Sequence, residues 1–231
     1  MKTLIIHGQN HKGSTYHIAS KLADKIGGEV TEFFLPRDFD EYCVGCTNCF
    51  MNGDEHCPHH EKLKPIKEAI READVIILAS PVYVYHATGQ MKGFLDHFGY
   101  RWMVHRPYGG MFTKQGVCIS TAAGGGMKST NKDMKDSLFF WGTGRIYTYG
   151  KAVQAIKWED VPEKIKNSIE TDTDRLAARI KAVHGHVKPG IKTRFLFFIM
   201  HLLQRKGISE PDMKYWKEMG WTGNIRPWKQ A

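Results

Sequence analysis

Short apolar segments alternate along most of the chain with longer segments in which apolar residues recur every three or four positions. The short segments predict β-strands at residues 2–6, 29–35, 75–79, 115–120 and 145–149. The longer segments predict amphipathic helices at residues 14–26, 63–73, 90–98, 127–141 and 160–184. Strands that alternate with helices favour a doubly wound α/β fold, and the continuous apolar run at 75–79 is typical of a strand buried on both faces.

The alternation ends at Lys188-Pro189-Gly190, where a C-terminal extension rich in aromatic residues begins. We therefore expect one α/β domain at residues 1–187 and a helical extension at 188–231. In the extension, the apolar stretch at 195–203 lies between basic residues, as it would in a helix on a membrane surface. Because residues 195–199 are apolar all around a helix, we expect burial in the core or in a dimer interface instead. No apolar run reaches the roughly 18 residues of a membrane span.

The composition is that of an ordinary globular protein, with 42% hydrophobic and 25% charged residues among 231. A formal net charge of +9 favours anionic partners, which include phosphates, dinucleotides, nucleic acid and membrane surfaces. The chain has no nucleic-acid-binding motif and its lysines are dispersed, which argues against nucleic acid as a partner. The N-terminus lacks the features of a secretory signal peptide, so we expect a cytoplasmic protein with reduced cysteines.

The first strand–helix turn, Gly8 to Thr15, is a candidate phosphate-binding loop. It joins a buried strand to a helix N-terminus, where free amide groups and the helix dipole attract an anion. The hydroxyls of Ser14 and Thr15 can add hydrogen bonds, and His11 or Lys12 can add charge. Alternatively, the segment is a plain turn in which Ser14 caps the helix. The loop lacks GxxxxGK[ST] and GxGxxG, which disfavours a nucleotide triphosphatase and an ordinary dinucleotide-binding fold.

Two more loops follow predicted strands at the same edge of the sheet. Ser80 to Tyr85 contains a proline that stiffens the turn and two aromatic rings, and Thr121 to Gly126 ends in three glycines. Each loop alone is an ordinary connection. Because ligands bind at the carboxyl ends of the strands in open α/β sheets, the three loops together predict a site with a phosphate seat and two walls for a planar ring.

With these loops, the chain resembles the flavodoxin-like NADPH-dependent FMN reductases. The resemblance rests on Gly8–Thr15, Ser80–Tyr83, Gln90–Asp96 and Ser120–Gly126, and it covers roughly the first 185 residues. It implies a flavodoxin-like sheet of five parallel strands in the order 2-1-3-4-5. It also implies FMN as the cofactor and NAD(P)H as the electron donor.

The same resemblance implies which residues contact FMN. The first loop would hold the phosphate, and the other two would flank the isoalloxazine ring. The implied contacts are Gln9, His11, Lys12, Ser14, Thr15, Pro81, Val82, Tyr83, Val84, Tyr85, Thr121, Ala122, Ala123, Gly124, Gly125 and Gly126. Tyr85 and His86 would lie nearest the ring, as contacts or proton donors. No catalytic side chain is expected, because the flavin carries the chemistry.

Four of the five cysteines are clustered: Cys43, Cys46, Cys49 and Cys57. Two-residue spacers let three thiolates converge while a fourth returns from a loop, which is the ligand supply of an iron–sulfur cluster. Zinc is an alternative, because it accepts mixed cysteine and histidine ligands. Three histidines adjoin the last cysteine: His56, His59 and His60. In a third interpretation the loop holds no metal and lies over the flavin or at a dimer contact.

The cysteine run, with Gly45 and Gly53 inside it, resembles that of the iron–sulfur flavoproteins, a branch of the same family. This resemblance implies a [4Fe–4S] cluster near FMN and a homodimer or higher homo-oligomer. We therefore expect an FMN-dependent oxidoreductase that passes electrons from NAD(P)H to a small-molecule or protein acceptor. The other hypotheses are a non-catalytic electron carrier or redox sensor, and a zinc-stabilised binding module.

Overall fold

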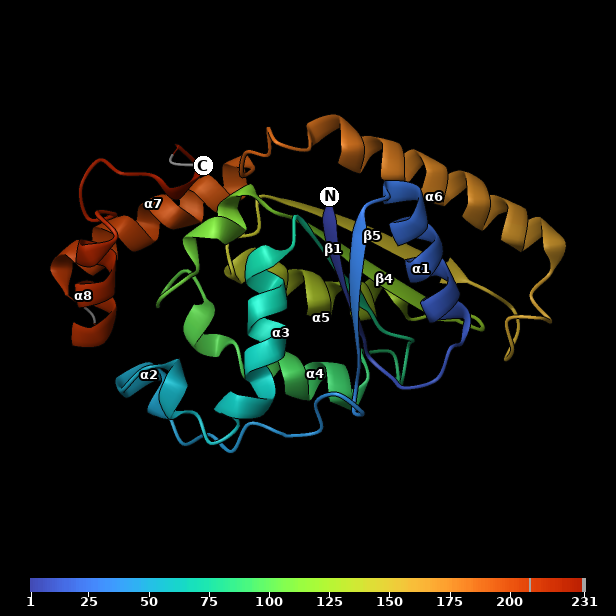
Figure 1. The fold of residues 1–231 in the computed structure, drawn as a ribbon, viewed down its shortest axis with the longest axis horizontal. Coiled ribbons are helices and arrows are strands. Elements are labelled where there is room, and N and C mark those ends of the chain that lie inside the picture. Colours follow the sequence, from blue (N-terminus) through green and yellow to red (C-terminus); the bar gives the residue numbers. More distant parts are fainter. Residues whose placement is uncertain (208, 230–231) are drawn as a thin grey trace.

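The computed structural model describes residues 1–207 and 209–229, which form a five-stranded sheet covered by helices (Figure 1). The strands are β1 Lys2–His7, β2 Glu29–Phe34, β3 Val75–Ala79, β4 Gln115–Ala122 and β5 Arg145–Ala152. All neighbours pair in parallel, in the order β2-β1-β3-β4-β5. This confirms the predicted fold class and strand order.

Helices cover both faces of the sheet and continue into the C-terminal extension. They are α1 Ser14–Ile26, α2 Asn48–Met51, α3 His60–Glu72, α4 Gly89–Asp96, α5 Met127–Phe140, α6 Glu163–Val183, α7 Ile191–Lys206 and α8 Glu210–Glu218. Because successive strand residues point to opposite faces, Leu4 and Ile6 pack with α3, α4 and α5, whereas Ile5 packs with α1 and α6. Both faces of the sheet are therefore buried, as the apolar run of β3 predicts.

Several of the predicted boundaries are wrong, including the end of β5, which lies at Ala152, and the start of α6, which lies at Glu163. The segment at 36–60, expected to be a loop, contains α2 and a short 3-10 helix at Asp54–His56. Helix α3 begins at His60 rather than Leu63, because its polar first turn gives no apolar signal. Strand β4 extends through Ala122, which pairs with Ala152 of β5. The first two residues of the predicted third loop therefore belong to the sheet.

The extension forms a separate apolar cluster at one end of the molecule. Phe197 and Met200 of α7 pack with Trp216 and Trp221, and with residues that precede β4. Burial of residues 195–199 in the core is wrong for Phe195 and Phe198, which are exposed, whereas burial in a dimer interface stays a prediction. In the described residues, no helix is both long and apolar enough to cross a membrane.

Candidate functional site

The ends of β1, β3 and β4 bring the three predicted loops to one rim of the sheet. The amide of Gly8 donates to the carbonyl of Ala79 across 2.7 Å, which ties the end of β1 to the end of β3. The amide of Val82 donates to the carbonyl of Thr121 across 2.9 Å, which ties the second loop to β4. The structure therefore places together the loops that were predicted to seat a phosphate and to wall a planar ring.

The first loop leaves an unpaired hydroxyl at the N-terminus of α1. Ser14 is the first residue of the helix, and its buried Oγ has no hydrogen-bond partner. The capping position is Gly13, so the alternative in which Ser14 caps the helix is wrong. The amide groups of a first helical turn have no partners within the helix. An anion bound here would pair with these amides and with the Ser14 hydroxyl, so the site fits a phosphate.

Two side-chain hydrogen bonds join the first loop to the other two. The hydroxyls of Thr15 and Thr121 lie 2.6 Å apart, and the Tyr83 hydroxyl donates to Oε1 of Gln9 across 2.7 Å. The second and third loops therefore each form one hydrogen bond with the first loop. The two residues that were expected to add charge lie exposed on it: His11 and Lys12.

The second loop ends in a tight turn with an unusual backbone. The peptide groups of Tyr83 and His86 exchange two hydrogen bonds, of 2.9 and 3.0 Å. Between them, Val84 and Tyr85 have φ values of 49° and 64°. This left-handed conformation is rare for residues other than glycine, above all for β-branched ones. The turn directs both side chains outward, so that Val84 is 94% exposed and Tyr85 is 70% exposed.

Helix α5 holds this turn in place. Oδ2 of Asp133 accepts a hydrogen bond from the Ala87 amide across 3.1 Å and lies 3.0 Å from Nδ1 of His86. The hydroxyl of Ser129 donates to the carbonyl of Tyr85. The His86 imidazole is therefore oriented by a carboxylate. The sequence reasoning missed Asp133 and Ser129, because polar positions on a helix do not show which loop they will contact.

The third loop is packed at its base and open at its tip. A Cβ atom added to Gly126, where φ is 95°, would lie 2.6 Å from Cγ1 of Val82, so this glycine permits close contact with the second loop. A Cβ atom on Gly124 or Gly125 would meet no atom within 4 Å. There is therefore open space beside the backbone, where a flat ligand can approach.

The four clustered cysteines lie on a segment that contains the one-turn helix α2, which carries Cys49. Gly45, Thr47 and Gly53 have φ values of 67°, 58° and 116°, which reverse the chain on either side of Cys49. Burial raises the pKa of Cys49 to about 11, and the other three thiols add to this shift. Within the described residues, no three Cys, His, Asp or Glu side chains converge as a metal site.

The segment offers four thiols and neighbouring imidazoles as donors, which suit an iron–sulfur cluster or a zinc ion. Nδ1 of His59 lies 2.9 Å from Nε2 of His97, and Nδ1 of His60 lies 2.9 Å from the Asp54 carbonyl. Both hydrogen bonds use Nδ1 and leave Nε2 as a ligand atom, so they keep zinc as an alternative. All four thiols are free, and thiolates are the ligands that iron–sulfur clusters use.

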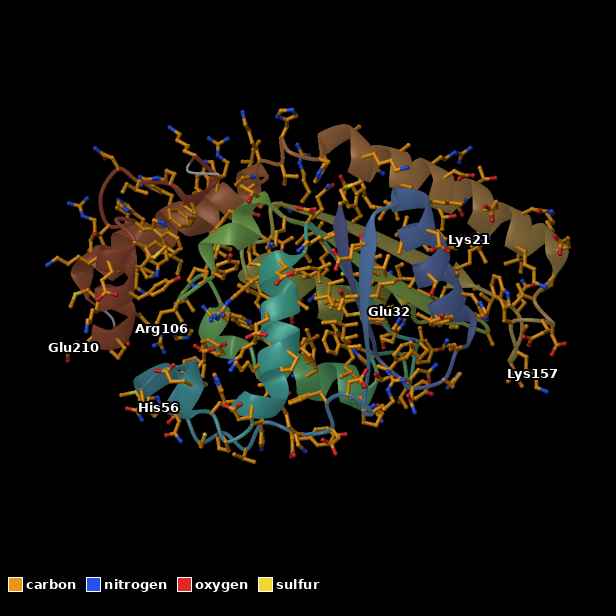
Figure 2. All side chains as sticks on the ribbon, in the orientation of Figure 1. Lys21, Glu32, His56, Arg106, Lys157 and Glu210 are labelled. Carbon is orange, nitrogen blue, oxygen red and sulfur yellow. The ribbon has the colours of Figure 1, made fainter. Side chains whose placement is uncertain are left out.

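Arg106 supports the cysteine loop from the side of the C-terminal extension. Its Nη2 donates to the carbonyl oxygens of Cys49 and Phe50, at 2.5 and 2.7 Å. Figure 2 shows Arg106 between the segment that carries His56 and the helix that begins at Glu210. The sequence reasoning did not identify this arginine, because it lies in an irregular segment with no motif.

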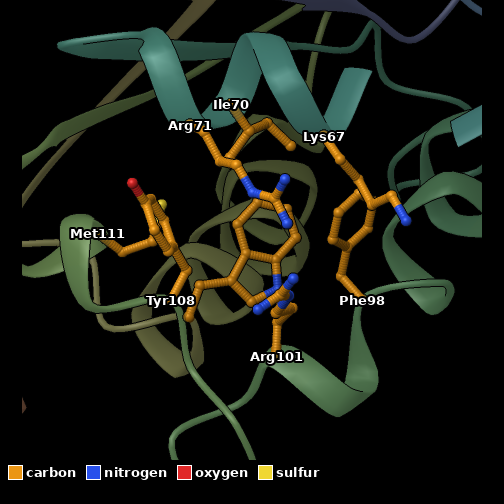
Figure 3. A pocket seen from close by; sticks show the side chains of 8 residues that line it. Lys67, Ile70, Arg71, Phe98, Arg101, Tyr108 and Met111 are labelled. Atoms are coloured by element: carbon orange, nitrogen blue, oxygen red, sulfur yellow. The ribbon is translucent and has the colours of Figure 1, made fainter. Parts of the chain in front are cut away.

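A small hollow elsewhere in the molecule does not compete for the cofactor. Lys67 and Arg71 of α3 line it, together with Arg101, Tyr108 and Met111 from the segment between α4 and β4 (Figure 3). Its volume is about 30 Å³, room for about one or two water molecules. A tricyclic ring does not fit there, so this hollow is not a flavin site.

A family model described as NADPH-dependent FMN reductase matches residues 1–157 of the chain. The chain is 27% identical over 232 residues to an iron–sulfur flavoprotein of Archaeoglobus fulgidus, an alignment that covers 95% of this chain and 99% of that protein. It is also 27% identical over 132 residues to an NADPH azoreductase of a Bacillus species, with 57% of this chain and 64% of that protein covered.

Solved structures share the fold at low sequence identity. An FMN-dependent NADH-azoreductase of Bacillus anthracis, in complex with FMN, aligns with a TM-score of 0.59 and 12% identity, over 78% of this chain and 100% of that one. A flavone reductase aligns with a TM-score of 0.56 and 18% identity, over 82% of this chain and 66% of that one. At these identities the likeness establishes the flavodoxin-like architecture alone.

Proposed function

Because the chain belongs to the NADPH-dependent FMN reductase family, we propose that it is an FMN-dependent oxidoreductase that passes electrons from NAD(P)H to a small-molecule or protein acceptor. The observation that carries this proposal is the rim where the three loops meet. There the Tyr83–Gln9 and Thr15–Thr121 hydrogen bonds hold the loops beside the unpaired hydroxyl of Ser14. FMN requires a binding site for its phosphate next to an open space for its flat isoalloxazine ring.

In this proposal the chain binds and orients the cofactor, which supplies the hydride and electron chemistry of its isoalloxazine ring. The first turn of α1, with Ser14 and Thr15, would hold the phosphate, and His11 and Lys12 would add positive charge. The loops at 81–85 and 121–126 would flank the ring. The rigid turn held by Asp133 would keep two exposed side chains, Val84 and Tyr85, in a fixed place at the slot.

We further propose that the four clustered cysteines hold a [4Fe–4S] cluster. The match to the Archaeoglobus fulgidus iron–sulfur flavoprotein runs along nearly the whole chain, which supports this branch of the family. Figure 1 shows α2 at the opposite end of the view from the start of α1. A cluster on α2 would therefore lie far from the flavin of its own chain. We accordingly propose a homo-oligomer in which the cysteine loop approaches the flavin of another subunit.

Spectroscopy of protein purified without air tests the cofactors. We expect the bands of one FMN per chain, together with broad absorbance from a cluster and matching amounts of iron and sulfide. Zinc without iron would contradict the cluster, and colourless protein that does not take up added FMN would contradict the flavin site.

Steady-state kinetics test the activity. We expect NADPH to be oxidised with turnover when an azo dye or a quinone is supplied as the acceptor. A flavin that a ferredoxin-like protein reduces, but NAD(P)H does not, would instead support the non-catalytic electron carrier.

A further inference from the structure

Helix α7 has two apolar sides, and only one of them is covered by protein. Phe197 and Met200 are buried in the cluster of the extension. The opposite side carries four apolar residues with exposed fractions of 84%, 63%, 51% and 42%: Ile191, Phe195, Phe198 and Leu202. Spacings of four, three and four residues place them in one line along the helix, roughly 16 Å long.

Basic residues surround this stripe. Residues 188–206 contain five basic residues and no acidic residue, and all five are exposed: Lys188, Lys192, Arg194, Arg205 and Lys206. The whole extension has nine basic and three acidic residues, so it carries +6 of the formal net charge of +9. Three residues of the stripe, Ile191, Phe195 and Phe198, line a hollow of about 330 Å³ together with Arg194 and Arg226. Apolar and cationic groups therefore alternate on one face.

This combination matches the surface of an anionic membrane. We propose that α7 docks the protein on a bilayer, with the apolar stripe at the acyl boundary and the basic residues at the lipid phosphates. A second copy of the same face would bring five cations against five, with no acidic residue between them, which is repulsive. Figure 1 shows α7 at the edge of the molecule, where a flat surface can approach it.

The proposed surface lies apart from the flavin rim, so it does not depend on the proposed function. The end of α6 lies at the amino end of β4, because the Gln115 side chain donates to the Ile180 carbonyl across 3.0 Å. Residues 184–188, which lead into α7, line one hollow with Asp74 and Gln115 at the same edge. The three loops lie at the carboxyl edge. A docked molecule would therefore keep its rim open to NAD(P)H and an acceptor.

Sedimentation with lipid vesicles tests the docking. The full-length protein is mixed with vesicles of phosphatidylcholine alone or of phosphatidylcholine with phosphatidylglycerol. We expect at least about tenfold tighter binding to the anionic vesicles, and weaker binding when salt is added. Equal binding to both kinds of vesicle, or to neither, would overturn the proposal.

Variants show whether α7 is responsible. Phe195→Ser with Phe198→Ser should abolish vesicle binding, whereas the control Ile156→Ser, at a residue 95% exposed between β5 and α6, should leave it unchanged. Arg205→Gln with Lys206→Gln, which removes two charges at exposed positions of α7, should also abolish it. A dimer in sedimentation equilibrium that the phenylalanine variant dissociates, without vesicle binding by the parent protein, would replace the membrane with a second copy.

Discussion

Asp212 of α8 forms an ion pair with Arg106, whose Nε lies 3.2 Å from the carboxylate. Asp212 is 3% exposed and also lies 2.8 Å from Nδ1 of His105. The same arginine donates to the carbonyl oxygens of Cys49 and Phe50. A carboxylate of the C-terminal extension therefore fixes the helix that carries the central cysteine, which gives the extension a role in shaping the cysteine loop.

Replacing Arg106 with lysine should loosen α2. The donors of a lysine share one nitrogen, so they do not span the two carbonyl oxygens and the carboxylate as Nη2 and Nε of the guanidinium do. We expect the free energy of unfolding to fall by about 1–3 kcal/mol and a thiol reagent to modify Cys49 faster in metal-free protein, with FMN affinity unchanged. Arg71→Lys, at an exposed arginine of α3, is the control. Equal thiol reactivity in the two variants would show that Arg106 does not position the cysteine.

Ser14→Ala should weaken the binding of FMN. The buried hydroxyl has no partner in the protein, so its removal costs the fold little but removes a hydrogen bond to the phosphate. A hydrogen bond to a charged group contributes about 1.5–3 kcal/mol, which corresponds to roughly 10- to 100-fold in the dissociation constant. Ser20→Ala is the matched control, because Ser20 lies on the same helix and its Oγ is also buried and unpaired. Equal FMN affinity in both variants would place the phosphate elsewhere.

Because of His7, the free energy of unfolding should fall when the pH is lowered into the mildly acidic range. Burial lowers its pKa, and the hydrogen bond to Glu32, 2.9 Å long, offsets this only in part. Below about pH 6.5 the unfolded chain binds a proton that the folded protein does not, so the free energy of unfolding falls as the pH falls. Urea unfolding between about pH 7 and pH 5.5 measures this loss.

Two variants separate the contribution of His7 from that of other histidines. In His7→Gln the fall in stability should be shallower, although His17 and His97, whose pKa values burial also lowers, still contribute. In Glu32→Gln the fall should be steeper, because the partner that raises the pKa of His7 is gone. Identical pH profiles in the two variants would exclude His7 as a source.

The sheet was predictable from sequence because its strands are short apolar runs, and β3 matches its predicted range at Val75–Ala79. Strand ends were less predictable, since β4 continues to Ala122 only because β5 supplies a partner there. The loops of the candidate site could be found because each directly follows a strand. The residues that hold these segments in place could not be found from sequence. Asp133 contacts a residue 46 positions away, and Asp212 contacts one 107 positions away. Contacts of this range arise from folding and leave no local pattern.

Val84→Asn should stabilise the protein and impair its activity. Asparagine tolerates the left-handed backbone that φ of 49° imposes on this β-branched residue, so we expect the free energy of unfolding to rise by about 1 kcal/mol. With 94% of the residue exposed, the valine side chain has little packing to lose. In the proposed site this exposed side chain lies beside the flavin slot, so its loss should raise the KM for NADPH or the acceptor. Val30→Asn, in β2, is the control and should be destabilising, because asparagine is unfavourable in a strand. A loss of stability in both variants would contradict the left-handed turn.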